Sequence, residues 1–236
     1  MDLTETTVSL DRIEQHWYYQ SKAKAVTSFI DTVNSKVVLD VGAGSGFFST
    51  HLLNNSSIRE AWCVDINYEK EIDSLTNDKP QHFRKKIDSI DADTVLLMDV
   101  LEHVEDDIGL LREYVKKVPP GAKFLISVPA FNFLWSDHDV FLGHKRRYTL
   151  NGLESVIARS GLQVKRSAYF FGAVFPIAAV TRLSQRHFKY PKRAPKSQLV
   201  EHRPIVNATL KALCNLEISV MNFNRLFGLT AFCLAE

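Results

Sequence analysis

Residues 37–46, Val-Val-Leu-Asp-Val-Gly-Ala-Gly-Ser-Gly, constrain the fold of this chain more than any other segment. The aliphatic run at 37–41 predicts a buried parallel strand. Glycines then occupy alternate positions, and because glycine has no Cβ they predict a tight turn in which bare backbone approaches a ligand. The residues from Phe47 to Leu53 predict a helix whose N-terminal N–H groups face that ligand.

The charge inside this motif narrows the kind of ligand. Asp40 stands two residues before the first glycine, where it would repel the pyrophosphate of a dinucleotide. The dinucleotide fingerprint also needs a third small residue, where this chain has the large Phe47. We therefore expect a cationic cofactor beside Asp40. The turn residues expected to contact it are Gly42, Ala43, Gly44 and Gly46.

A second acidic residue has the spacing that a nucleotide site requires. Asp65 lies near the end of the expected strand 61–66, 21 residues after Gly44. Nucleotide-binding α/β folds place an acid about 20 residues past the glycine turn, where it accepts hydrogen bonds from ribose hydroxyls. The apolar strand at 94–98 is also followed by an acid, and carboxyl ends of parallel strands meet at one edge of a sheet. The further residues expected in the cofactor site are Ile66, Met98 and Asp99.

Strands alternate with helices along the chain, which predicts an α/β fold with a doubly wound, mostly parallel sheet. A length of 236 residues suits a single domain, 1–236. Residues 10–33 are expected to form an N-terminal helical cap, and residues 170–227 an insertion before the last strand. The expected strands are 36–41, 61–66, 81–85, 94–98, 123–128, 162–169 and 228–234, and the other expected helices are 46–55, 107–117 and 149–159.

Composition limits the partners and the compartment. A net charge of +2 does not point to nucleic acid. Three cysteines lie far apart without metal-ligand spacing, which suits a reducing cytoplasm. The N-terminus is polar and acidic, unlike a signal peptide, and no apolar run reaches the roughly 18 residues of a membrane span.

Two further blocks complete a pattern with the glycine turn. Asp99-Val100-Leu101-Glu102-His103-Val104 follows the fourth expected strand, and a long loop at 129–149 follows the fifth. Together they resemble class I S-adenosylmethionine-dependent methyltransferases, of a small-molecule type from bacteria, over about residues 12–170. The resemblance implies a Rossmann-like sheet of seven strands with an antiparallel last strand. It also implies S-adenosylmethionine as cofactor, S-adenosylhomocysteine as product, and Met98 near the adenine or the sulfonium.

The same two blocks hold the candidates for catalysis and acceptor binding. His103, His138 and His144 are candidate bases, because imidazole titrates near neutrality and can take a proton from a hydroxyl. An amine or carboxylate acceptor would need no base. The residues expected to contact the acceptor are Glu102, Trp135, Arg147 and Tyr148.

Structural roles are the alternative for these residues. Glu102 and His103 would then hydrogen-bond to neighbouring loops, and the acids of the 129–149 loop would pair with its own arginines. We expect no metal site, because Asp99, Glu102 and His103 lack firm ligand spacing.

The resulting hypothesis is in-line methyl transfer from S-adenosylmethionine to an oxygen or nitrogen of a small molecule, with a weak hint of a glycan- or lipid-linked acceptor. One alternative is a non-catalytic cofactor-binding or membrane-surface adaptor. Residues 168–204 combine an uncharged, aromatic-rich stretch with seven Lys or Arg residues against Glu201, which suits an anionic inner membrane face. A helical cap with solvated cations is the simpler explanation of that segment. An RNA methyltransferase that uses the same cations is the third alternative.

Overall fold

A computed structural model describes residues 15–30, 35–187 and 203–236. Its centre is an eight-stranded sheet with the order β3-β4-β2-β1-β5-β6-β8-β7. The strands β4, β2, β1, β5 and β6 run parallel to one another, β3 pairs antiparallel with β4, and β8 runs antiparallel between β6 and β7. The bounds are β1 (Val37–Val41), β2 (Glu60–Val64), β3 (Ile72–Thr76), β4 (Lys79–Arg84), β5 (Thr94–Met98), β6 (Lys123–Pro129), β7 (Val164–Phe170) and β8 (Thr230–Ala235).

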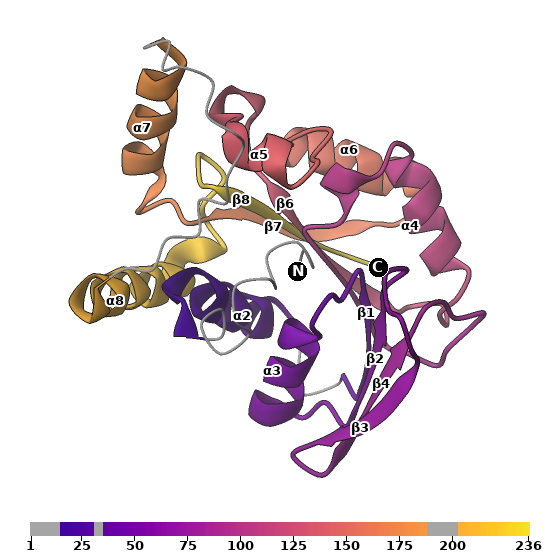
Figure 1. The fold of residues 1–236 in the computed structure, drawn as a ribbon. Coiled ribbons are helices and arrows are strands. Elements are labelled where there is room, and N and C mark those ends of the chain that lie inside the picture. Colours follow the sequence, from indigo (N-terminus) through magenta and orange to yellow (C-terminus); the bar gives the residue numbers. More distant parts are fainter. Residues whose placement is uncertain (1–14, 31–34, 188–202) are drawn as a thin grey trace.

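Helices cover both faces of the sheet (Figure 1). One face carries α2 (Trp17–Phe29), α3 (Phe47–Asn55) and α8 (Pro204–Met221), and the other carries α4 (Asp107–Val115) and α6 (Leu150–Ser160). Each helix layer buries apolar side chains against its own face of the sheet, so the core has two halves. The remaining helical elements are η1 (Leu101–His103), η2 (Asn132–Leu134), α5 (Asp137–Phe141) and α7 (Phe175–His187).

The predicted fold class is confirmed, with a correction to the number of strands. The sheet has eight strands rather than seven, because β3 forms a hairpin with β4 at the edge. Asn77 and Asp78 join the two strands with φ of 52° and 59°, the left-handed pair that a tight two-residue hairpin turn requires. The sequence did not predict β3 because most of its side chains are exposed, so it has no apolar alternation.

The other predicted elements differ from the structure mainly at their ends. The helix predicted over 149–159 is α6: Thr149 caps it by accepting a hydrogen bond from the backbone N–H of Gly152, and Gly161 ends it in the left-handed conformation. The described part of the N-terminal helix spans 17–29, and residues 10–14 and 31–33 of its predicted range lie outside the described residues. In the 170–227 insertion, α7 and α8 flank residues 188–202, which hold most of the predicted basic segment and also lie outside the described residues.

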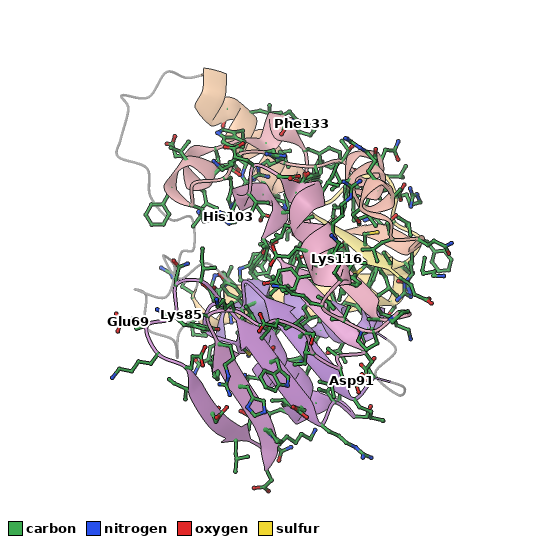
Figure 2. All side chains as sticks on the ribbon, turned by 90° about the vertical axis from the view of Figure 1, so that its right-hand side faces the viewer. Glu69, Lys85, Asp91, His103, Lys116 and Phe133 are labelled. Carbon is green, nitrogen blue, oxygen red and sulfur yellow. The ribbon has the colours of Figure 1, made fainter. Side chains whose placement is uncertain are left out.

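The carboxyl ends of the parallel strands lie together on one side of the sheet. In Figure 2, Glu69, Lys85 and His103, which follow β2, β4 and β5, lie on that side, whereas Asp91, which precedes β5, lies on the opposite side. Three residues that follow strands adopt positive φ although they are not glycine: Asp99 after β5, Phe131 after β6 and Phe171 after β7. Strained backbone of this kind concentrates at functional sites. We therefore expect the functional site at this edge of the sheet.

Candidate active site

The glycine turn between β1 and α3 adopts a conformation that only glycine tolerates well. Gly42, Gly44 and Gly46 have φ of 66°, 55° and 73°. The backbone N–H groups of Gly42 and Ala43 both donate to the carbonyl of Val64, which ties the turn to the end of β2. A Cβ built on Gly42 would lie 2.7 Å from Cγ2 of Val100, so the turn also packs closely against the segment after β5.

Asp65 links this turn to the end of β2. Its Oδ2 accepts a hydrogen bond of 3.0 Å from the backbone N–H of Gly44, and its Oδ1 accepts one of 2.9 Å from Asn67. The carboxylate is thereby oriented where it borders the cavity described below. The structure thus brings the predicted acid and the predicted glycine turn together, over 21 positions of sequence.

Asp40 lies beneath the turn and does not border that cavity. Its Oδ2 accepts a hydrogen bond of 2.7 Å from the hydroxyl of Ser49 on α3. Burial raises the pKa of Asp40 to about 6. At neutral pH the side chain is mainly ionised, so it can act on a cationic cofactor only through its field and not through contact.

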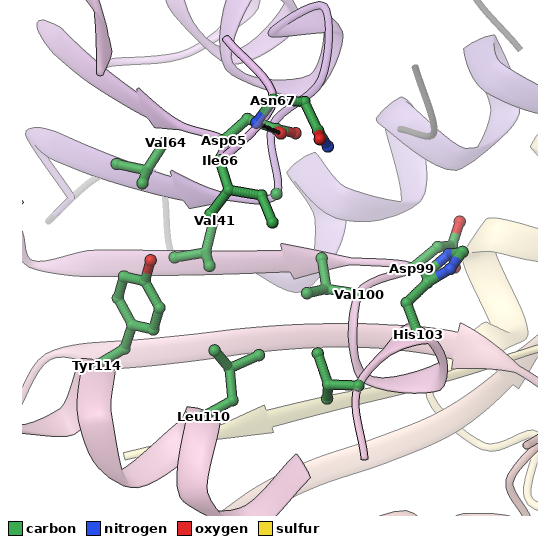
Figure 3. A pocket seen from close by; sticks show the side chains of 12 residues that line it. Val41, Val64, Asp65, Ile66, Asn67, Asp99, Val100, His103, Leu110 and Tyr114 are labelled. Carbon is green, nitrogen blue, oxygen red and sulfur yellow. Dashed lines mark hydrogen bonds between the residues drawn. The ribbon is translucent and has the colours of Figure 1, made fainter. Parts of the chain in front are cut away.

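A cavity of about 290 Å³ opens at the carboxyl ends of β1, β2 and β5 (Figure 3). Tyr114 and Leu110 of α4 lie at one end of the view, Asp99 and His103 at the other, and the segment from Asp65 to Asn67 along one side. The other lining residues are Val41, Gly42, Val64, Ile66, Val100 and Val104.

The chemistry of this lining fits S-adenosylmethionine. The apolar wall suits a planar base, Asp65 can accept hydrogen bonds from ribose hydroxyls, and Asp99 supplies negative charge for a cationic end. Ile66, with 84% of its surface exposed, lies on the rim. Met98 does not line the cavity; it is buried in the core, and its sulfur accepts a hydrogen bond from the Ser127 hydroxyl at 3.6 Å.

Asp99 is held by a lysine that sequence reasoning missed. Lys22 of α2 has a fully buried side chain whose ammonium donates a hydrogen bond to Asp99 Oδ2. Ser127 donates to Oδ1 of the same carboxylate at 3.3 Å. Burial by itself disfavours both charges, but the ion pair outweighs it: the pKa of Lys22 is raised and that of Asp99 is lowered. Both groups are therefore charged at neutral pH.

A cluster of three titratable side chains lies next to Asp99. Glu102, His103 and His144 offer ligand atoms that all lie within 4.8 Å of one another. Glu102 is fully buried, and neither of its carboxylate oxygens has a hydrogen-bond partner among the described residues. Burial, followed by the charge of Asp99, raises the pKa of Glu102 well above its usual range. The structure thus brings together two of the three predicted histidines, whose ring centroids are 4.7 Å apart.

The 129–149 loop is held by an internal ion pair, as the structural alternative expected. Arg147 is buried and forks onto Asp139 with hydrogen bonds of 2.6 and 2.9 Å, and it also donates to the carbonyl of Ala130. Tyr148 is buried as well, with its hydroxyl 2.8 Å from Asp107 Oδ2. Both residues were predicted to contact the acceptor. In this structure their polar groups bond within the protein.

Of the two remaining predicted residues, Trp135 lines a second cavity and His138 does not. This cavity, of about 550 Å³, is lined by Asn132, Trp135, Ser136, Asp137, Val140, Lys145, Arg146 and Arg182. His138 on α5 lines neither this cavity nor the first one. Burial, together with the positive charge of Arg182, lowers the pKa of His138 to about 4, so its imidazole is neutral at physiological pH.

Sequence signals for the missed residues differ in strength. Lys22 stands four positions before Val26 and seven before Phe29, both buried, so it occupies the apolar stripe of its helix. A lysine in that stripe is a detectable signal of a buried charge. Asn67 and Tyr114 line the first cavity from a loop and from α4, and their positions alone give no such signal.

Four features define the class of protein: the glycine turn, the acid that follows β2, the first cavity and the antiparallel last strand. They are those of an α/β enzyme that binds S-adenosylmethionine and transfers its methyl group. The chain belongs to the family described as "Methyltransferase domain", whose model matches residues 15–167. It is a methyltransferase dependent on S-adenosylmethionine. A sequence comparison with curated proteins finds no match.

Solved structures share the fold at low sequence identity. A complex of the Haloferax volcanii Trm112 methyltransferase activator with a methyltransferase contains a chain 15% identical, with a TM-score of 0.55, covering 100% of this chain and 97% of that one. A sarcosine dimethylglycine methyltransferase from Galdieria sulphuraria is 14% identical, with a TM-score of 0.52 and coverage of 92% and 83%. CalO1, a methyltransferase in calicheamicin biosynthesis solved with S-adenosylhomocysteine, is 15% identical over 63% of this chain and 50% of that one, with a TM-score of 0.50.

Proposed function

We propose that this protein transfers a methyl group from S-adenosylmethionine to an oxygen or nitrogen of a small-molecule acceptor. One observation carries the proposal: Asp65, the glycine turn and Asp99 border one cavity, and His103 lies at its Asp99 end (Figure 3). When bound, the cofactor supplies a methyl group activated by a sulfonium, which leaves as a neutral thioether. The protein therefore has mainly to bind and orient the two reactants.

The chain's own residues divide this work. Asp65 and the turn from Gly42 to Gly46 would hold the nucleoside end, and Asp99, anchored by Lys22, would attract the cationic end. Ile66 would cover the rim, and Met98 would support the floor from the core. For a hydroxyl acceptor, His103 or His144 would receive its proton, because both belong to the cluster beside Asp99.

The second cavity is the candidate for acceptor binding. Trp135 offers a ring for a planar or sugar-like group, and Lys145, Arg146 and Arg182 surround it with positive charge. Lys145 pairs with an exposed partner, Glu105, so an anionic acceptor can displace that contact at little cost. This composition suits an acceptor that carries a carboxylate or phosphate, and it leaves a glycan- or lipid-linked molecule as the finer hypothesis.

Calorimetric titration with S-adenosylmethionine and S-adenosylhomocysteine tests the cofactor assignment. The wild-type protein should bind both at micromolar concentration, and Asp65→Ala should lose most of that affinity while keeping its fold by circular dichroism. Asp91→Ala, at an exposed position before β5, is the matched control for the loss of one carboxylate. Equal affinity in the Asp65 and Asp91 variants would remove Asp65 from the site.

A surface role is the second candidate, because α7 and α8 expose apolar side chains. The most exposed of them are Ile177, Val180, Ile205 and Leu216. Among the described residues, no helix has the length and apolarity needed to cross a bilayer. Apolar side chains on helix surfaces can still dock on an interface. Co-sedimentation with anionic vesicles, compared between wild type and Ile177→Ser/Val180→Ser, tests this role, and equal recovery of both proteins with the vesicles would exclude it.

A further inference from the structure

The cluster of Glu102, His103 and His144 has the composition of a metal site. Glu102 and His103 come from η1 after β5, and His144 comes from the segment after α5, 41 residues further along the chain. Their candidate ligand atoms all lie within 4.8 Å of one another. Two imidazoles and one carboxylate form a frequent set of three protein ligands around zinc and related ions.

The carboxylate of Glu102 is the strongest sign that a cation belongs here. Its side chain is fully buried, and both of its oxygens lack a hydrogen-bond partner among the described residues. A buried carboxyl group whose oxygens have no hydrogen-bond partner destabilises the folded state. The nearby ammonium of Lys22 does not satisfy it, since Lys22 donates to Asp99. Glu102 therefore faces two histidines with unused acceptor capacity.

His144 is oriented as a metal-bound histidine usually is. Its Nδ1 lies 2.9 Å from Oδ1 of Asp139, so with the proton on Nδ1 the lone pair of Nε2 remains for an ion. Arg147 locks Asp139 in place through its two-pronged contact. An arrangement of carboxylate, histidine and metal fixes the ring and raises its basicity. The buried ion pair between Arg147 and Asp139 thus orients His144 as a ligand.

We propose that Glu102, His103 and His144 bind a divalent transition-metal ion of the class that accepts imidazole and carboxylate, such as Zn²⁺, Mn²⁺ or Co²⁺. Bonds of about 2.0–2.2 Å to such an ion require the side chains to turn inward by roughly an ångström. Three protein ligands leave at least one coordination position open. The spacing within Asp99–His103 did not predict this site, because its third ligand comes from another element and Asp99 bonds to Lys22 instead.

The open position gives the ion a role that rests on the proposed function. His103 also lines the cofactor cavity, so an acceptor hydroxyl on the ion would lie beside the methyl donor. With the ion bound, His103 and His144 would serve as its ligands and not as bases. The ion would lower the pKa of that hydroxyl, and the proton would pass to solvent. The oxygen lone pair then forms the O–CH3 bond, while the C–S bond breaks and leaves its electron pair on sulfur. Hydroxyl acceptors are thereby favoured over amines.

Titration of the chelator-treated full-length protein with Zn²⁺ and with Co²⁺ tests the site directly, by calorimetry and by the visible absorbance of bound Co²⁺. Wild type should bind one ion per chain. His51→Ala, which removes a half-buried histidine of α3 that is not part of the cluster, is the matched control and should bind as wild type does. Asp139→Asn removes a group that supports a ligand, and it should lower the metal affinity by roughly 10–100-fold. Glu102→Gln and His144→Ala each remove a ligand, and they should lower the metal affinity by more than that.

Thermal unfolding shows whether a variant that does not bind metal is still folded. Without metal, Glu102→Gln should melt no lower than wild type, because it replaces a buried carboxyl group that has no hydrogen-bond partner by an amide of nearly the same shape. Saturating Zn²⁺ should raise the Tm of wild type and of His51→Ala but not that of Glu102→Gln. A wild type that binds neither ion, or a Glu102→Gln variant that binds as tightly as wild type, would overturn the proposal. A parallel titration with S-adenosylmethionine separates the two hypotheses, because loss of metal binding alone leaves the proposed methyl transfer intact.

Discussion

Lys22 and Asp99 form an ion pair that joins the N-terminal helix to the end of β5 across 77 positions of sequence. The lysine side chain is fully buried, whereas 28% of the aspartate side chain is exposed. The ammonium also lies within 6.0 Å of the ring centroids of Tyr18, Phe48 and Phe232. Lys22 of α2 thus holds the carboxylate of Asp99, which borders the cofactor cavity, and aromatic rings surround the lysine ammonium.

Replacing Lys22 with Met should lower the free energy of unfolding by about 3 kcal/mol, since Asp99 would keep a partly buried charge without its partner. Lys117→Met is the control, because the pair of Lys117 with Glu113 is an exposed i,i+4 contact worth less than about 1 kcal/mol. Urea unfolding measures both. The double variant Lys22→Met/Asp99→Asn should regain much of the loss, and equal costs for the two single variants would contradict a special role of this pair.

A methyl group on Gly42 should disturb the cofactor site more than the same change at Gly143. Both glycines have positive φ, 66° and 70°, so alanine pays about 1–2 kcal/mol of backbone strain at either position. Only at Gly42 would the new Cβ meet another group, Cγ2 of Val100 at 2.7 Å, whereas at Gly143 nothing lies within 4 Å. Gly42→Ala should therefore cost a further 1–3 kcal/mol or so and weaken S-adenosylmethionine binding. Chemical unfolding and calorimetry of both variants check this, and equal effects would exclude the contact as the cause.

Asp40 should make the protein less stable as the pH rises from 4 to 6. Its pKa in the fold is raised to about 6 by burial, so over this range the folded protein holds a proton that the unfolded chain has lost. That difference costs on the order of 3 kcal/mol above pH 6. Asp40→Asn should therefore match wild type near pH 3.5 and exceed its stability at pH 7. Denaturant unfolding at both values tests the sign, with the exposed Asp91→Asn as the control for charge.

The architecture was predictable where the signal is local. Continuous apolar runs predicted β1, β5 and β6, because strands covered by helices on both faces need apolar side chains on both. The range 149–159 predicted α6 closely, because the caps at Thr149 and Gly161 are local signals that each act on their own helix. The exposed strand β3 has no such pattern and was missed.

In the candidate site, too, local sequence signals could be predicted and contacts between distant segments could not. The glycine turn and Asp65 were predictable, because a motif of ten residues and one spacing carry the signal. The contact of Lys22 with Asp99 and the approach of His144 to Glu102 join distant segments, and such pairings depend on how the loops fold over the sheet edge. The bonding of Arg147 to Asp139 joins residues eight positions apart within one loop, and the structural alternative had anticipated that the acids of this loop pair with its arginines.

His138 should make the protein less stable as the pH falls from 6.5 to 4. Burial and the charge of Arg182 lower its pKa to about 4. Between pH 6.5 and 4 the unfolded chain therefore binds a proton that the folded protein does not bind. The slope is opposite to that of Asp40 over the shared range, so the two variants can be told apart. His138→Gln should lose stability relative to wild type at pH 7.5 and recover the difference near pH 4.5. Unfolding curves at the two values decide, and a constant difference would contradict the lowered pKa.

Arg147→Lys distinguishes a structural role of Arg147 from the predicted contact with the acceptor. Lysine cannot reproduce the fork onto Asp139 or the bond to the carbonyl of Ala130, so the loop should lose about 2–3 kcal/mol of stability. Arg225→Lys is the control, because half of the Arg225 side chain is exposed and its pair with Glu154 is worth less than about 1 kcal/mol. Denaturant unfolding of the free protein measures both variants. An acceptor contact would instead leave stability unchanged and raise KM, so a stable Arg147→Lys protein would return this residue to the acceptor site.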